Sequence, residues 1–432
     1  MASLPKSFNL AEPIPSLPDG AQSQLITCRP LSGSTFLPSG IIEVDLGNRG
    51  WVDPKSISIR YKISATSADA SGNCMIGVPV YTPFQRVSTL VGGASIDSIS
   101  QYNQVAHVLV NTSYDVGTKY GLQASLGYSN ATAGNMAYLD GRLDVVNGAY
   151  SFFVSAPLIG TLLTNCDKQL PLFAMPQIRF QFTLDTIANM YFVEAAQTFA
   201  KLPTAFSISN FELCYTMTDL GAGVEKMVYD MGRTLSLKSH GLSNTGVSVA
   251  DGVVGSQSYV FNQRFASIRS AFICPSLTTQ SKWAEIVDCT SGQGDYQILV
   301  GNQAFPQAPL STTNNKSGIL QETRRAVGNL FGNQNAMSID STEFGRNAND
   351  AINTLYYEPG KFIVGINLDK IQAGDHVMMS GTSTYNTPIS VNINMGTALA
   401  VPGDTPVNLN LILDYDAILV LDPVARQLSV RS

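Results

Sequence analysis

The feature that most constrains the fold is an alternation of apolar and polar residues with a period of two, which recurs along the chain. It runs through residues 57–63, 178–185, 211–218 and 407–415. Successive side chains of a strand point to opposite faces of a sheet, so this pattern predicts strands with one face on a core. Two sheets that pack face to face form a sandwich or a jelly roll. We therefore predict an all-β chain.

A weak internal repeat indicates that this arrangement is used twice. The chain has 432 residues, enough for two or more domains that each bury a core. Residues 56–61 are similar to residues 267–272, and the closing strand at 211–217 is similar to residues 409–415. Both pairs are separated by roughly 200 residues, as expected for a duplicated domain whose loops have diverged.

Proline and glycine mark the expected domain boundaries. Prolines in residues 1–22 exclude a helix and predict an extended N-terminal arm. Two glycines near residue 222 predict a hinge, followed by a short connecting helix. We expect an arm at 1–22, a first jelly roll at 23–220, a linker at 221–234 and a second jelly roll at 235–432.

Two segments are predicted to be helical, and one long segment is predicted to be a loop. Residues 94–128 contain apolar residues at every third or fourth position, with Asp97 near the N-terminal end of the expected helix. Residues 347–357 are the second expected helix. Residues 311–342 are rich in Ser, Thr, Asn and Gly and predict a long excursion, which in a compact domain is usually functional or interfacial.

The low charge of the chain predicts extensive contacts with other subunits. Charged residues make up 13% of the chain, about half of the usual share of roughly 25%. A protein of this size needs a charged surface to stay dispersed as a monomer. Asn, Gln, Ser and Thr replace the missing charges, and these residues suit wet, hydrogen-bonded interfaces.

The balance of charge argues against nucleic acid as a direct partner. The net charge is −6, and the densest basic cluster is the pair Arg324 and Arg325. A protein that neutralises many phosphates needs a basic stripe or tail. We therefore expect no direct sequence-specific binding of nucleic acid.

No targeting segment or disulfide framework is expected. Residues 1–25 lack the continuous apolar segment of a signal peptide, and no run of 18 or more apolar residues predicts a transmembrane helix. The cysteines are widely spaced and form no C-x-x-C motif, so we expect buried thiols. They are Cys28, Cys74, Cys166, Cys214, Cys274 and Cys289.

The search for catalytic and metal-binding motifs assigns no site. The histidines, His107, His240 and His376, do not form a pair with zinc-ligand spacing, and His107 is expected to be packed or on the surface. Nucleophile-elbow and phosphate-loop motifs are absent, and Gly92-Gly93 is expected to form a turn. We therefore predict no enzyme activity, no catalytic residue, no cofactor and no metal.

Three carboxylates near the C-terminus are the strongest remaining candidates for a site. Asp414, Asp416 and Asp422 could bind Ca²⁺ or serve a glycosidase. We expect them instead at the solvated end of a strand. The two tryptophans, Trp51 and Trp283, are too few for a sugar-binding platform.

Four stretches carry a resemblance to a known family. They are residues 39–44 with 51–56, residues 92–99 with Tyr102 and Asn103, residues 158–163 with 168–172 and 175–180, and residues 415–422 with 428–430. On these stretches the chain resembles the double jelly-roll major capsid proteins of tailless icosahedral DNA viruses, the group of the adenovirus hexon. Polinton-like and adintovirus-type capsid proteins are the most similar within it. The resemblance implies two tandem eight-stranded antiparallel jelly rolls with short helices in their loops.

The resemblance also implies a role. Three chains would form a pseudo-hexagonal homotrimer, and many trimers would tile an icosahedral shell in the virion, assembled inside the host cell. The loops at 64–77, 127–142 and 311–345 would form outer towers and intersubunit clasps. Penton and minor capsid proteins would be further partners, and contact with an internal membrane stays open.

Two alternatives remain open on the sequence. The first is a lectin-like or carbohydrate-active β-sandwich protein, which would need clustered aromatic residues or a carboxylate pair in a groove. The second is a minor capsid or spike protein of the same virion.

Overall fold

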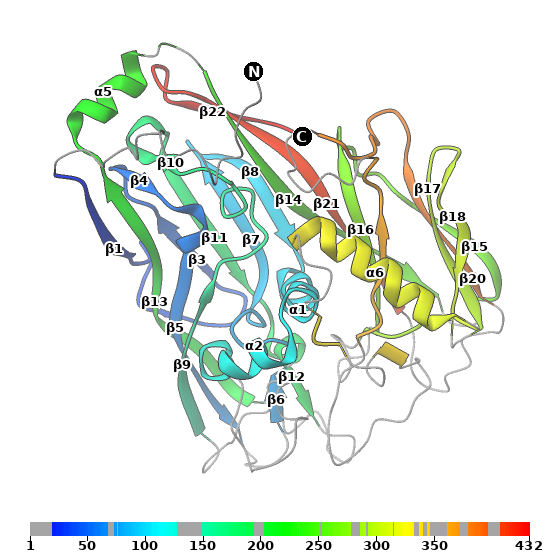
Figure 1. Cartoon of the computed structure of the whole chain (residues 1–432). Coiled ribbons are helices and arrows are strands. Elements are labelled where there is room, and N and C mark those ends of the chain that lie inside the picture. Colours follow the sequence, from blue (N-terminus) through cyan, green and yellow to red (C-terminus); the bar gives the residue numbers. More distant parts are fainter. Residues whose placement is uncertain are drawn as a thin grey trace, which may run out of the picture.

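The computed structural model shows two β-sandwiches side by side, which we call the first and second roll (Figure 1). It describes residues 20–67, 73–75, 77–127, 149–193, 203–230, 232, 234–250, 253–277, 286–290, 293–313, 315–331, 337–339, 344–345, 361–370, 379–395 and 407–432. Everything below refers to these residues.

The first roll contains two antiparallel sheets. One sheet has the order β1-β13-β5-β9, and the other has the order β3-β11-β7-β8. The strands are β1 (Gln22–Cys28), β3 (Ile41–Asp45), β5 (Ser58–Ser67), β7 (Phe84–Val91), β8 (Ala94–Ser100), β9 (Ala149–Pro157), β11 (Ile178–Leu184) and β13 (Pro203–Asp219).

The second roll repeats this arrangement. Its sheets have the orders β14-β21-β16-β19 and β15-β20-β17-β18. Taken in chain order, its strands pair as those of the first roll do, so both rolls are eight-stranded jelly rolls. The strands are β14 (Leu235–Val249), β15 (Gly255–Phe261), β16 (Ile268–Leu277), β17 (Gly294–Val300), β18 (Gln303–Ser311), β19 (Val364–Asn367), β20 (Ile389–Met395) and β21 (Val407–Asp422).

Short helices and strands fill the connections. Helix α1 (Tyr102–Ser113) follows β8, and helix α6 (Lys316–Phe331) follows β18 at the same place in the repeat. Helix α5 (Ala222–Asp230) connects the rolls, as predicted. The other elements are α2 (Val116–Gly121), α3 (Gln123–Leu126), α4 (Ile187–Met190), the 3₁₀ turns Pro54–Ser56 and Leu172–Ala174, and the strands β2 (Thr35–Phe36), β4 (Trp51–Val52), β6 (Asn73–Met75), β10 (Leu170–Pro171), β12 (Tyr191–Val193) and β22 (Gln427–Arg431).

The period-two pattern gave the right strands because each has one face on a core. In β11, every second residue from Ile178 to Leu184 is buried, and the residues between are partly exposed. The aromatic rings of Tyr61, Phe84, Phe182 and Phe211 meet at centroid distances of 5.1–6.2 Å between the two sheets of the first roll. Such contacts add stability beyond the burial of area.

Two predictions of local structure are wrong. Residues 94–100 form strand β8 and not the start of a helix, because Gly92 and Gly93 make a hairpin turn that pairs β8 with β7. The expected loop at 311–342 contains the 16-residue helix α6, whose first turn is capped by the Asn315 side chain accepting from the Gly318 backbone N–H at 2.9 Å.

Some predictions fall partly or wholly outside the described residues. These include nearly all of the N-terminal arm, the helix expected at 347–357 and most of the loop at 127–142. Of the loop expected at 64–77, residues 64–67 belong to β5 and residues 73–75 form β6. Within the described ranges, the helices are too short or too polar to cross a membrane.

Candidate functional site

The two rolls meet in a contact that contains many buried polar groups, and we call this contact the seam. The first roll contributes β8, α1 and the turn at 158–165, and the second roll contributes the outer face of its β14-β21-β16-β19 sheet. Figure 1 shows α1 and β8 on the side of the first roll that faces β14, β21 and β16. The seam therefore joins one edge of the first sandwich to a sheet face of the second.

Helix α1 is buried on every side because it lies between the rolls. All residues from Tyr102 to Thr112 are buried, polar ones included. The Gln104 side chain accepts from the Asn410 amide at 2.7 Å and donates to the Ser276 hydroxyl at 3.4 Å. These bonds satisfy polar groups that would otherwise be costly to bury, and they fix the position of the second roll on the helix.

Leu162 projects from the turn at 158–165 into the core of the second roll. Its side chain is fully buried in the apolar cluster of that roll. Its backbone N–H donates to the Asp97 carboxylate at 2.9 Å, and its carbonyl accepts from the Ser239 hydroxyl. Gly241 makes room for it, because a Cβ there would lie 2.8 Å from Leu162 Cδ2 and 2.6 Å from the Tyr415 ring.

Charged side chains form a buried cluster on the second-roll face of the seam, and we call it the ionic cluster. His240 Nδ1 lies 3.0 Å from Asp414 Oδ1, and Arg269 lies 3.7 Å from Asp414 and 4.0 Å from Asp416. Lys238 approaches Asp416 at 3.7 Å. Both carboxylates are thus paired with cations, as buried charges require.

The position of these carboxylates corrects the prediction from the sequence. Asp414 and Asp416 lie inside β21 and are buried, not at a solvated strand end, because the first roll covers this face of the sheet. Asp422 does lie at the strand end, where its carboxylate accepts from the backbone N–H groups of Val424 and Ala425 at 3.0 Å.

Burial shifts the protonation of two seam carboxyls. Desolvation raises the pKa of Asp416, against the opposing effects of the Ser267 hydroxyl, Lys238 and Arg269. Desolvation also raises the pKa of Asp97 to about 7, although backbone N–H groups of Leu162 and Ser98 oppose it. Folding of the seam is therefore linked to pH.

The ionic cluster is suited to joining strands β14, β16 and β21 within the second roll. The Asp414–His240 pair resembles part of a catalytic triad, but the Ser267 hydroxyl donates to Asp416 at 2.6 Å and not to the imidazole. Asp414 and Asp416 are paired with Arg269, Lys238 and His240. In the described part of the chain, no group of three His, Cys, Asp or Glu residues is arranged to hold a metal ion.

Most of the other residues that the sequence singled out are packed inside the protein. His107 is buried on α1 beside Asn111. Trp51 packs edge-on against Phe173 at 5.5 Å. His376 and Trp283 lie outside the described residues. Of the cysteines, Cys166, Cys214, Cys274 and Cys289 are buried free thiols as predicted, and Cys28 is a half-buried free thiol.

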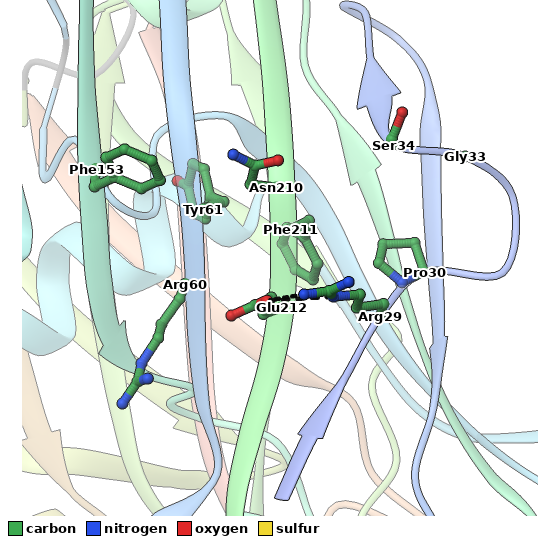
Figure 2. A pocket seen from close by; sticks show the side chains of 10 residues that line it. All are labelled: Arg29, Pro30, Gly33, Ser34, Arg60, Tyr61, Phe153, Asn210, Phe211 and Glu212. Atoms are coloured by element: carbon green, nitrogen blue, oxygen red, sulfur yellow. Dashed lines mark hydrogen bonds and ion pairs between the residues drawn. The ribbon is translucent and has the colours of Figure 1, made fainter.

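The outer face of the first-roll sheet β1-β13-β5-β9 carries a cavity of about 540 Å³. Figure 2 shows Arg29 and Glu212 bonded across it, with Arg60 and Phe153 on the neighbouring strands. The ion pair measures 3.3 Å and is exposed, so its contribution to stability is small. The cavity is lined by Arg29, Pro30, Gly33, Ser34, Arg60, Tyr61, Phe153, Asn210, Phe211 and Glu212.

Comparison with solved structures shows the same architecture over nearly the whole chain. The Faustovirus major capsid protein superimposes with a TM-score of 0.61 at 7% identity, covering 95% of this chain and 92% of that one. The mavirus major capsid protein gives a TM-score of 0.58 at 10% identity, covering 100% and 95%. A chain of the Sputnik virophage gives 0.59 at 10% identity, covering 100% and 92%. The chain is a double jelly-roll protein.

Sequence comparison adds nothing to this assignment. No protein-family model matches the double jelly-roll protein, and no curated protein matches it. At 7–12% identity the likeness shows the fold, which is the fold that the sequence resemblance implied.

Sequence reasoning missed the seam almost entirely. It treated Asp97 as a helix-terminal charge, and it gave Leu162 and Gly241 no role. One signal was present, since Asp414 and Asp416 occupy the positions between and after the apolar residues of the 407–415 alternation, on the face of the strand that turns away from the core. In this double jelly-roll protein they mark the sheet face that a neighbouring roll covers.

Proposed function

We propose that this double jelly-roll protein is the major capsid protein of a DNA virus. In this proposal it forms pseudo-hexagonal homotrimeric capsomers that tile an icosahedral shell. The observation that supports it most strongly is that both rolls match the major capsid proteins of Faustovirus and mavirus, over 95–100% of this chain and 92–95% of those proteins.

The seam supports the trimer on physical grounds. It is heterologous, because an edge of one roll meets a sheet face of the other. Heterologous contacts between like units leave one unused surface at each end, and they close into rings or grow as filaments. Three copies supply six rolls, which is the number that a pseudo-hexagonal ring requires. The low charge fits a protein whose surface is largely covered by neighbours.

The proposal includes partners and location. The protein would act in the virion, assembled inside the host cell, beside penton and minor capsid proteins, without enzyme activity and without sequence-specific contact to nucleic acid. The division into an arm at 1–22, rolls at 23–220 and 235–432 and a linker at 221–234 stays a prediction. Contact with an internal membrane stays open.

The first experiment measures the mass of the purified protein by light scattering coupled to size exclusion, with negative-stain imaging of the same fraction. A particle of three times 46.3 kDa with a six-sided outline is the expected result. A monomer or an irregular dimer would contradict the capsomer proposal and return the lectin-like alternative to consideration.

A second measurement separates a shell protein from a minor capsid or spike protein. On a gel of purified particles, this chain should be the most abundant protein. A low copy number would leave the fold intact and refute the shell-forming role.

A further inference from the structure

A small cleft opens in the seam where strand β14, at the edge of its sheet, meets the first roll, and we call it the seam cleft. Its volume is about 180 Å³. The first roll contributes the C-terminal end of α1, the segment 157–165 and Lys55 of the 3₁₀ turn Pro54–Ser56, and the second roll contributes His240 and Leu242 of β14. A molecule bound in the seam cleft would therefore contact both rolls.

The floor of the seam cleft is apolar. Leu109 of α1, Leu158 and Leu242 line it and are 5%, 3% and 1% exposed. Gly160, with a φ of 82°, allows the chain to pass close to these side chains, since a Cβ there would lie 3.0 Å from Leu242 Cδ1 and 3.4 Å from Leu109 Cδ1. Aliphatic groups of both rolls thus form one continuous surface beneath the cleft.

The rim of the seam cleft is polar and carries a cation. The Lys55 ammonium lies 3.8 Å from the Asp167 carboxylate, and both side chains are mostly exposed, so this ion pair is weak and can be exchanged for another anion. His240 Nδ1 faces Asp414 at 3.0 Å, which leaves the other ring nitrogen for a ligand. The Asn165 amide donates to the His240 carbonyl at 3.0 Å and fixes the rim to β14.

The size and lining of the seam cleft select a small amphiphilic occupant. Because one water molecule fills about 30 Å³ of the liquid, 180 Å³ corresponds to roughly six non-hydrogen atoms. Sites for small molecules are concave and mostly apolar, with a few polar groups that orient the ligand. A short aliphatic chain fits the floor, and a carboxylate at its end fits the ammonium group at the rim.

We propose that the seam cleft binds a medium-chain fatty acid, with its chain on Leu109, Leu158 and Leu242 and its carboxylate at Lys55 and His240. The chain lies between the rolls, so the ligand binds the folded seam and not the unfolded chain and stabilises the contact between the rolls. This site lies within one copy of the chain and does not rest on the proposed trimer.

Ligand-observed NMR titration of the full-length protein tests the chemistry of the ligand. The probes are octanoate, octanol and octylamine, which share one chain and differ in the charge of the head group. We expect octanoate to bind most tightly and octylamine most weakly. Absence of binding by all three would refute the site, and octanol or octylamine binding as tightly as octanoate would refute the carboxylate contact.

Two substitutions locate the binding. Ser113→Phe, at a half-buried position on the rim, places a ring in the seam cleft and should abolish binding of octanoate and octanol. Lys55→Gln should weaken octanoate by about 5-fold, as expected for loss of an exposed ion pair, and leave octanol unchanged. The matched controls are Ser258→Phe on β15 and Lys226→Gln on α5, both exposed, and both should bind octanoate as the wild type does. Unchanged binding by Ser113→Phe would refute the site.

Photolabelling identifies the site without altering the protein. An octanoate analogue with a diazirine at the end of its chain is irradiated with the full-length protein, and the labelled peptide is sequenced by mass spectrometry. The expected label lies in residues 102–114, 157–165 or 235–249, and excess octanoate should suppress it. A label elsewhere, or one that octanoate does not suppress, would overturn the proposal. Light scattering without ligand tests the trimer separately, so either result can fail alone.

Discussion

Removing the side chain of Leu162 tests whether the two rolls share one core. Leu162 belongs to the first roll by sequence but is fully buried in the apolar cluster of the second. Leu162→Ala removes three carbons, worth about 2.4 kcal/mol at roughly 0.8 kcal/mol each. The cavity adds to this, because Gly241 offers no side chain to fill it and strand β14 is held along its length by β21. We expect a loss of about 3 kcal/mol, within the range of about 2–5 kcal/mol for buried leucines.

The loss is measured by urea unfolding followed by circular dichroism. The dependence of the unfolding free energy on urea concentration is compared between variants, because a changed slope would indicate that the transition is no longer two-state. The matched control is Leu37→Ala, the same chemical change at a side chain that is 64% exposed, which should cost less than about 0.5 kcal/mol. The variant should also be cleaved faster by protease at the connection between the rolls, because their contact is weaker. A loss below about 1 kcal/mol for Leu162→Ala, or one equal to that of Leu37→Ala, would show that the rolls are held together by other contacts.

Three further predictions follow from the buried polar groups. Because the pKa of Asp97 is about 7 when folded and near 4 when unfolded, the folded state holds a proton that the unfolded state releases, and stability falls as pH rises from 4 to 7. Urea unfolding across this range should show wild type losing up to about 1.4 kcal/mol per pH unit relative to Asp97→Asn, and parallel curves would contradict the assignment. Arg269→Met leaves Asp414 and Asp416 with less positive charge and should cost about 3–5 kcal/mol in the same assay; a neutral effect would show that other cations hold them. Cys28 is half-buried, whereas the four buried thiols are shielded and burial raises the pKa of three of them, so Ellman's reagent should modify Cys28 before these four, which should react only after unfolding.

Much of the fold could be predicted from the sequence because it depends on contacts within one sandwich. Strands β5, β11, β13 and β21 alternate between apolar and polar residues because one face of each packs on a core. This pattern can be seen within each strand alone. The tandem arrangement was also indicated, but the matched segments 56–61 and 267–272 are out of register, because Tyr61 faces the core of its roll and Phe272 faces away from the core of its own.

The errors have physical causes that a single sequence hides. Residues 94–100 contain Ile96 and Ile99 at a helical spacing, and the Gly92-Gly93 pair that makes them half of a hairpin was taken as a turn before a helix. In α6, the residues that bury one face are Ile319, Thr323 and Ala326 among polar neighbours, so the helical period was obscured by composition.

The seam could not be predicted because it depends on how two domains meet. The sequence predicts Asp414 and Asp416 at a solvated strand end, and they are buried only because the first roll covers them. The same is true of α1, whose polar residues suit a solvated helix until Asn410 and Ser276 reach it from the second roll. The order of residues in an element shows which of its faces is apolar, but it does not show which face a partner covers.

The length of chain between the two sides of the seam has a consequence for synthesis. Gln104 on α1 is satisfied by Asn410, which is 306 residues further along. At a translation rate of about 5–20 residues per second, the ribosome needs roughly 15 to 60 s to deliver that partner. For this interval, the nascent first half has no second roll to cover α1 or to receive Leu162, and both are open to any other chain made nearby. The order of the two halves in the gene thus sets a waiting time during which the first half depends on its surroundings to remain unaggregated.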